Sequence, residues 1–179
     1  MPLKKEIKQH ADKDKAKNLQ RFFKTGDGEY GEGDIFLGIT VPKQREIVKE
    51  FKDKITLKDA KELLKSNIHE ERLIALLLLI EKYKKADEKI KKEIFYFYLE
   101  NTEYINNWDL VDLSAPNIIG NFLSSKKSER KILYESAKSD NLWEKRISII
   151  SCSAFIRNND FEDALASSEI LLNDKHDLI

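Results

Sequence analysis

The sequence predicts an all-α protein, built as a superhelix (α-solenoid) of stacked antiparallel helix pairs. Three observations predict it. Apolar residues recur at helical spacing along most of the chain, and no segment sustains a two-residue alternation of apolar and polar residues. The helix pairs also return at a regular interval. A plain helical bundle is the alternative that fits the same helices.

Short polar segments such as KSNIHEE, KKADEK and SSKKSE divide the predicted helices. Pro42 fits the first turn of the second helix, where its missing N–H is no loss. Asp140 or Asn141 fits the N-cap before LWEKR. We expect helices over 3–24, 42–52, 57–65, 69–84, 87–100, 107–123, 127–138, 141–157 and 161–172, and one more starting near 174.

The clearest loop is TGDGEYGEGD, which holds four of the six glycines. It follows a helix and lacks the GK[ST] ending of a nucleotide-binding loop, so we expect a mobile connection. Tyr30, at its centre, could stack or hydrogen-bond with a ligand.

Composition excludes several classes of protein. Charged residues make up 36% and apolar residues 41% of the 179, which is too apolar for a disordered chain and too charged for a membrane protein. The N-terminus has no apolar signal segment, and the lone Cys152 excludes an intramolecular disulfide framework. Cys152 lies in the apolar segment IISCSAF and is expected to be a buried, unreactive thiol. A cytoplasmic protein without a membrane partner follows as the default.

The charge is balanced overall but not along the chain. The chain has 32 basic and 32 acidic side chains. Residues 1–100 hold 23 basic and 19 acidic ones, whereas residues 101–179 hold 9 basic and 13 acidic ones. Any surface for nucleic acid must therefore be a local patch.

Three long segments each open with polar residues and continue as an apolar-striped helix. They begin at HEERL, NNWDL and NLWEK, and Arg72, Asp109 and Arg146 occupy equivalent places, 37 residues apart. Helix pairs that recur at about 35–47 residues are typical of HEAT-type repeats, whose stacking forms a curved array with a concave groove.

Asp112 is the unusual residue of the second of these helices. At about 100° per residue, Asp112 falls within the apolar arc, one turn after Trp108 on the same face, whereas Asp109 falls outside it. A carboxylate there is costly unless it is paired or functional. It could pair with a basic side chain such as Arg146, or it could stabilise positive charge on a substrate. Pro116 should kink this helix, because its ring clashes with the carbonyl of Asp112.

Arg146 has the group that suits a phosphate, since its planar fork donates two parallel hydrogen bonds. Thr40, Lys43 and Arg45 surround a predicted helix start, where free N–H groups favour an anion. The three histidines show no metal-ligand spacing, so no metal site is expected.

NNWDLVDLSAPNIIGNFL and NLWEKRISIISCSAFIRNNDFEDAL resemble the DNA alkylation repair family of HEAT-like DNA glycosylases, the AlkD type. FLGITVPKQREI and HEERLIALLLLIEKYKKAD resemble two further segments of that family, so the resemblance covers roughly residues 20–179. It implies excision of cationic N3- or N7-alkylated purines from double-stranded DNA by hydrolysis of the N-glycosidic bond, without metal or cofactor. It also implies that Trp108 and Asp112 are catalytic and that Arg146 contacts DNA.

The family carries a second Trp on the next long helix, and this chain ends before that segment would begin. We therefore expect one HEAT-like domain, 1–179, that lacks its C-terminal helices, as a monomer. Two other functions stay open: a DNA-binding repeat protein without catalysis, and a protein-interaction scaffold in which Asp112 is a structural partner of Arg146.

Overall fold

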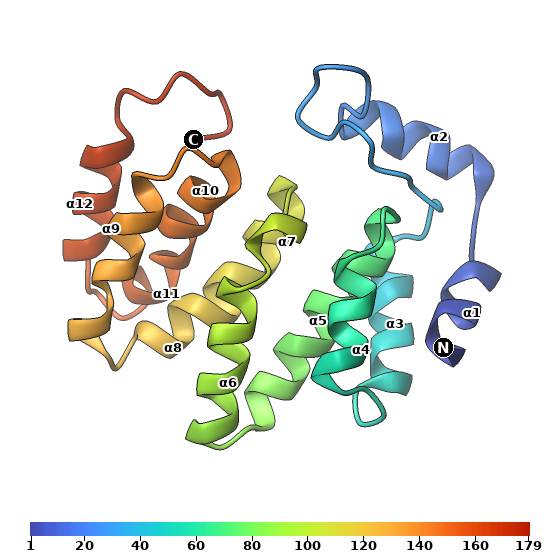
Figure 1. Cartoon of the computed structure of the whole chain (residues 1–179), viewed down its shortest axis with the longest axis horizontal. Helices are drawn as coiled ribbons and strands as arrows, with labels where there is room; N and C mark the ends of the chain where they lie inside the picture. The colour runs from blue at the N-terminus through green and yellow to red at the C-terminus, as the bar shows by residue number, and fades with distance from the viewer. The chain divides into compact units, whose positions relative to one another are not determined.

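The computed structural model describes residues 1–179 and consists of helices and connecting turns (Figure 1). Its only β-type pairing is an isolated parallel bridge between Ile35 and Ile68, which confirms the all-α prediction. The helices group into two compact units, Met1–Lys85 and Ala86–Ile179, which we describe separately as unit 1 and unit 2. None of the helices combines the length and the apolar character that a membrane-spanning segment needs.

Unit 1 is organised around one buried helix. Every side chain of α5 from His69 to Ile80 is buried, and α5 packs against both α3 and α4. The apolar run of this helix has no polar face, which is typical of a helix covered on all sides. The helices of unit 1 are α1 (Pro2–Gln9), α2 (Lys13–Phe22), α3 (Val41–Phe51), α4 (Leu57–Leu64) and α5 (His69–Lys85).

The prediction of a single helix over 3–24 is wrong, because the chain breaks between α1 and α2. Asp12 is the N-cap of α2, and its carboxylate accepts hydrogen bonds from the N–H groups of Asp14 and Lys15. Its own N–H donates to the carbonyl of Leu37 at 2.8 Å. Gly38 packs directly on this turn, where a Cβ would lie 2.1 Å from the carbonyl oxygen of Asp12. Capping and a tertiary contact thus override the helical periodicity.

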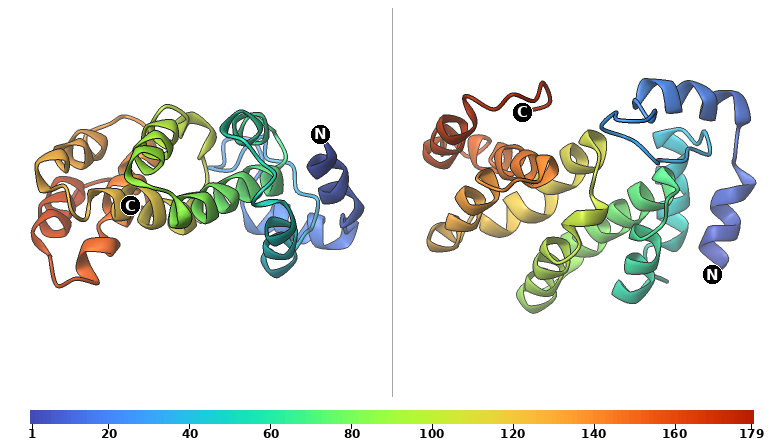
Figure 2. Two further views of the ribbon diagram at one scale, coloured as in Figure 1. Left: turned by 90° about the horizontal axis from the view of Figure 1, so that it is seen from below. Right: turned by 45° about the horizontal axis from the view of Figure 1, so that its top comes forward.

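Unit 2 is centred on α10, which packs against α7, α9 and α12. The three helices α9, α10 and α12 stay side by side in every view of Figures 1 and 2. Of the two predicted N-cap candidates, Asn141 is the N-cap of α10. Its side chain accepts a hydrogen bond from the N–H of Trp143. The α-helices of unit 2 are α6 (Glu88–Leu99), α7 (Trp108–Ala115), α8 (Asn121–Leu123), α9 (Lys131–Ala137), α10 (Leu142–Ser151), α11 (Ser153–Ile156) and α12 (Glu162–Leu171).

Pro116 interrupts the predicted helix 107–123, as expected. The helix α7 ends at Ala115, a π-helical turn spans Pro116–Gly120, and α8 follows. Gly120 allows this turn to approach α10, because a Cβ there would lie 2.4 Å from the carbonyl oxygen of Ser151. The apolar stripe predicted for this helix is buried throughout: Val111, Ala115, Ile118, Ile119, Phe122 and Leu123.

The predicted helix start near residue 174 is wrong. Residues 172–179 form turns after α12. Asp174 accepts hydrogen bonds from the N–H of His176 and from Nζ of Lys145, which ties this segment to α10. The side chain of Asp174 therefore caps a turn instead of starting a helix.

Candidate functional site

The site in unit 2 is built where α7 and α10 meet. Asn107 caps α7, and its side chain accepts the N–H of Trp108, so that Trp108 is the first helical residue. Asp112 follows one turn later on the same face. Both side chains are intermediate in exposure, whereas their neighbours Leu110 and Val111 are fully buried. The aromatic ring and the carboxylate therefore lie at the boundary between the core and solvent.

Arg146 of α10 holds the carboxylate of Asp112 with two parallel hydrogen bonds. Nε donates to Oδ1 at 2.8 Å and Nη2 to Oδ2 at 2.7 Å. The third nitrogen, Nη1, donates to the backbone carbonyl of Leu178. This is the fork geometry in which arginine binds carboxylates and phosphates most specifically. Of the two alternatives that the sequence left open for Asp112, the structure shows the pairing with Arg146.

The pairing does not seal the carboxylate from solvent. The side chain of Asp112 is 36% exposed and that of Arg146 16% exposed. An ion pair at this depth fixes the orientation of the carboxylate at a modest gain in stability. The arrangement consequently presents a pre-oriented, partly exposed carboxylate one helical turn from an aromatic residue. Trp143, at the start of α10, is buried in the core.

The four other predicted residues lie in unit 1. Thr40 is exposed and is the N-cap of α3, although its side chain makes no capping hydrogen bond. Lys43 pairs with Glu46 at 2.9 Å, and Arg45 is exposed without an ion-pair partner. The ammonium group of Lys24 lies 5.6 Å from the ring centroid of Tyr30. Thr40, Lys43 and Arg45 share one helix end, while Tyr30 belongs to the glycine-rich loop.

Glu70, which the sequence analysis did not single out, positions this helix end. Its buried carboxylate accepts the backbone N–H groups of Leu37, Gly38 and Ile39, at 2.8–3.1 Å. These residues lead directly into α3. No signal in the sequence singled out Glu70, because the apolar run that follows covers every face of α5, and His69, Glu71 and Arg72 share it equally.

A second buried network ties the same connection to α5. Asp34 forms hydrogen bonds with Nδ1 of His69 at 2.9 Å and with Nη2 of Arg72 at 2.6 Å. Burial acts to raise the pKa of Asp34, but the hydrogen bonds and charges of His69 and Arg72 outweigh it and hold the pKa below its usual value. The connection between the glycine-rich loop and α3 is therefore anchored by two carboxylates.

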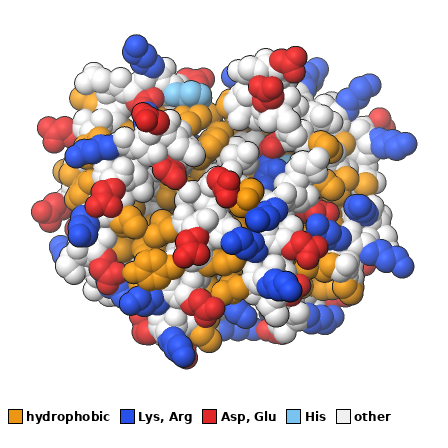
Figure 3. All heavy atoms as spheres, in the orientation of Figure 1, with side chains coloured by type: hydrophobic (Ala, Val, Ile, Leu, Met, Phe, Trp, Pro, Cys, Tyr) orange, Lys and Arg blue, Asp and Glu red, His pale blue; other side chains and the backbone are white.

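Charge is mixed on the face of the molecule that Figure 3 shows. On the face in Figure 3, acidic and basic side chains are interspersed, so no area of one sign dominates it. No group of three or more His, Cys, Asp or Glu side chains is arranged to hold a metal ion.

Comparison with known proteins relates the whole chain to one family. The sequence model of the family described as "DNA alkylation repair enzyme" matches residues 3–179. Among solved structures, the chain is similar to a predicted DNA alkylation repair enzyme from Enterococcus faecalis, with a TM-score of 0.70 and 12% identity, over 94% of this chain and 78% of that one. At this identity the likeness establishes the fold. No curated protein matches the sequence.

Proposed function

Because the chain belongs to the DNA alkylation repair enzyme family, we propose that it is a DNA glycosylase that excises cationic N3- or N7-alkylated purines from duplex DNA. The observation that carries this proposal is the partly exposed carboxylate of Asp112, oriented by Arg146 and one helical turn from Trp108. A carboxylate that is oriented but still accessible is the group that this chemistry requires.

The substrate's own charge decides which catalytic groups are needed. A purine alkylated at N3 or N7 is cationic, so it leaves as a neutral base without a general acid. Positive charge then develops on the deoxyribose, as in the oxocarbenium-like transition state of glycoside hydrolysis. A fixed carboxylate beside the sugar lowers the barrier electrostatically and can orient the attacking water. We assign both roles to Asp112.

Trp108 supplies a surface for the sugar or for the cationic base. An aromatic face adjacent to a cation contributes about 0.5–2 kcal/mol, more when water is excluded. Because this attraction depends on the positive charge of the base, Trp108 would favour alkylated purines over normal ones.

Arg146 has two roles in this proposal. Nε and Nη2 orient Asp112, whereas Nη1 donates to the carbonyl of Leu178. A phosphate oxygen accepts hydrogen bonds at least as well as a carbonyl. A DNA phosphate could therefore replace the Leu178 carbonyl while the pair with Asp112 stays intact.

Thr40, Lys43, Arg45 and Tyr30 are proposed as further DNA contacts. The first turn of α3 has N–H groups without intrahelical acceptors, and a helix N-terminus attracts phosphate. Contacts of this kind hold the duplex without reading its sequence.

The test is release of base from a duplex that contains N7-methylguanine, quantified by mass spectrometry. We expect release by this chain, and a rate about 100-fold lower for Asp112→Asn, which keeps the size of the side chain but removes its charge. Asp109→Asn, on the same helix but outside the apolar arc, is the matched control and should leave the rate within about twofold of the unmodified chain.

Two results would redirect the assignment. Salt-sensitive binding of the duplex without any released base would favour the DNA-binding protein without catalysis. Equal rates of base release for Asp112→Asn and the unmodified chain would show that the Asp112–Arg146 pair has only a structural role, as in an interaction scaffold.

A further inference from the structure

A pocket of about 400 Å³ opens in unit 2, away from the Asp112–Arg146 pair. Glu144 of α10 lines the pocket. It lies about 200° around the helix axis from Arg146, so the two side chains leave α10 on nearly opposite faces. The pocket volume lies within the range of small-molecule sites. Its lining comes from the end of α6 and the following turn, from α9 and the turn after it, and from α10: Leu99, Thr102, Ile132, Glu135, Ser136, Ser139, Glu144 and Ile147.

Two carboxylates of the pocket have no cationic partner. The half-buried Glu144 accepts hydrogen bonds from the hydroxyl groups of Thr102 at 2.9 Å and Ser139 at 2.6 Å, and no Lys, Arg or His pairs with it. Glu135 is exposed and likewise has no ion pair. The two hydroxyl groups hold the Glu144 carboxylate in place but leave its charge uncompensated, so the pocket favours a cation.

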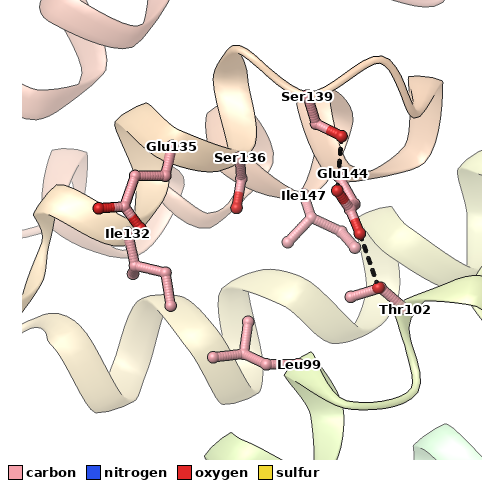
Figure 4. Close-up of a pocket in the computed structure, with 8 residues that line it drawn as sticks. All are labelled: Leu99, Thr102, Ile132, Glu135, Ser136, Ser139, Glu144 and Ile147. Carbon is pink, nitrogen blue, oxygen red and sulfur yellow. Dashed lines mark hydrogen bonds between the residues drawn. The ribbon is translucent and has the colours of Figure 1, made fainter.

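The remainder of the lining is divided between apolar side chains, Leu99, Ile132 and Ile147, and hydroxyl groups, those of Thr102, Ser136 and Ser139. Figure 4 shows Glu135, Ser136 and Ile132 on one side, Glu144 with its hydroxyl partners on the other, Ile147 between them and Leu99 below. A metal ion would need more oxygen ligands than two carboxylates and would gain nothing from the apolar wall. An anion would be repelled. A cation with a hydrocarbon body satisfies both parts of the lining.

We propose that this pocket binds an aliphatic amine, independently of the function proposed for Asp112. The ammonium group would lie against the carboxylate of Glu144, and the hydrocarbon chain would cover Leu99, Ile132 and Ile147. A diamine would reach Glu135 with its second ammonium group. The hydroxyl groups of Ser136 and Ser139 are further acceptors for ammonium N–H groups.

The first experiment compares ligands that differ only in charge, by titration of the unmodified chain followed by NMR at constant ionic strength. Pentylamine should bind at least about tenfold more tightly than 1-pentanol, because a charged hydrogen bond to a carboxylate is lost in the alcohol. 1,5-Diaminopentane should bind more tightly than pentylamine. Equal affinities for pentylamine and 1-pentanol would overturn the proposal.

The second experiment assigns the ammonium position. Glu144→Gln keeps the size of the side chain and its bonding to both hydroxyl groups, and should weaken pentylamine binding about tenfold. Glu135→Gln should remove only the advantage of the diamine over pentylamine. Glu169→Gln, an exposed glutamate of α12 outside the pocket, is the matched control and should change neither. Unchanged pentylamine affinity in Glu144→Gln would overturn the assignment, and the comparison of ligands on the unmodified chain decides the proposal if that variant does not fold.

A lysine side chain of a peptide carries the same alkylammonium group as a free amine. Nα-acetyl-lysine N-methylamide distinguishes the two sources. Binding at least about tenfold weaker than that of pentylamine supports a free amine, because the pocket then rejects the flanking backbone. If this compound binds more tightly than pentylamine, the ligand of the pocket is a peptide lysine and not a free amine.

Discussion

The carboxylate of Asp112 and the guanidinium group of Arg146 face each other edge to edge, with N···O distances of 2.8 and 2.7 Å. The two residues come from α7 and α10, which are separated along the chain by α8 and α9. The pair therefore couples α7, which carries the proposed catalytic group, to α10, a helix that begins about 34 residues later in the chain and packs against it. Its partial exposure determines how much it contributes to stability.

We expect a coupling free energy of about 1 kcal/mol between Asp112 and Arg146, since partly exposed pairs contribute little but this one is bidentate. The measurement is a double-mutant cycle with Asp112→Asn, Arg146→Gln and the double variant, each unfolded in urea. Effects that add to within roughly 0.3 kcal/mol would show that the two side chains do not interact in solution.

Glu70→Gln should destabilise the fold by about 2 kcal/mol, because the carboxylate accepts three backbone N–H groups in a buried site and the amide places an N–H₂ group there. Amide hydrogen exchange should accelerate at Leu37, Gly38 and Ile39, whose N–H groups bond to Glu70. Glu50→Gln, an exposed position of α3, is the control and should change stability by no more than about 0.5 kcal/mol. Unchanged exchange at the three amides would contradict the anchoring role.

Stability should fall in acid partly through Asp34, whose pKa in the folded state is lowered. A carboxyl group with a lowered folded pKa contributes stability that is present above its unfolded pKa, about 3.9, and is lost as the pH falls through its folded pKa. Asp34→Asn should therefore be less stable at neutral pH and should show a shallower loss below about pH 4. The free energy of unfolding, measured from pH 7 to pH 2, checks this. Asp27→Asn, at an exposed loop position, is the control and should show the same dependence of the free energy of unfolding on pH as the unmodified chain.

Cys152 should react with a thiol reagent only after unfolding. Burial raises the pKa of its thiol to about 11, and the side chain has no exposed surface. At pH 8 we expect the native protein to react at least about 100-fold more slowly than the protein in denaturant, because both the thiolate fraction and access are reduced. Equally fast reaction of the native protein would show that α10 and α11 open readily.

Gly120→Ala should destabilise the protein by about 1–3 kcal/mol, because the added Cβ would lie 2.4 Å from the carbonyl oxygen of Ser151 and 2.7 Å from Cβ of Ala154. The sign is diagnostic, since glycine to alanine in an uncrowded helix is stabilising by about 1 kcal/mol. Unfolding in urea measures the change in the free energy of unfolding. A gain in stability would mean that the turn Pro116–Gly120 can move away from α10.

Much of the fold was predictable because helix formation and burial leave a periodic signature. The four helices α3 to α6, the interruption at Pro116 and the buried stripe from Val111 to Leu123 all follow from local spacing and backbone chemistry. The break at residues 10–12 was not predictable, since it depends on Gly38 and Leu37, which are distant in sequence. The same applies to residues 172–179, where Lys145 holds Asp174 in a turn.

By itself, the sequence determined the fold class, the residues on each helix face and the anomaly of Asp112, because these depend on spacings within one helix. Only the tertiary structure decided that Arg146 orients Asp112, that Glu70 anchors the entry to α3, and that Glu135 and Glu144 line one pocket. Each of these depends on how separate helices pack, and packing brings together side chains whose spacing along the chain carries no periodic signal.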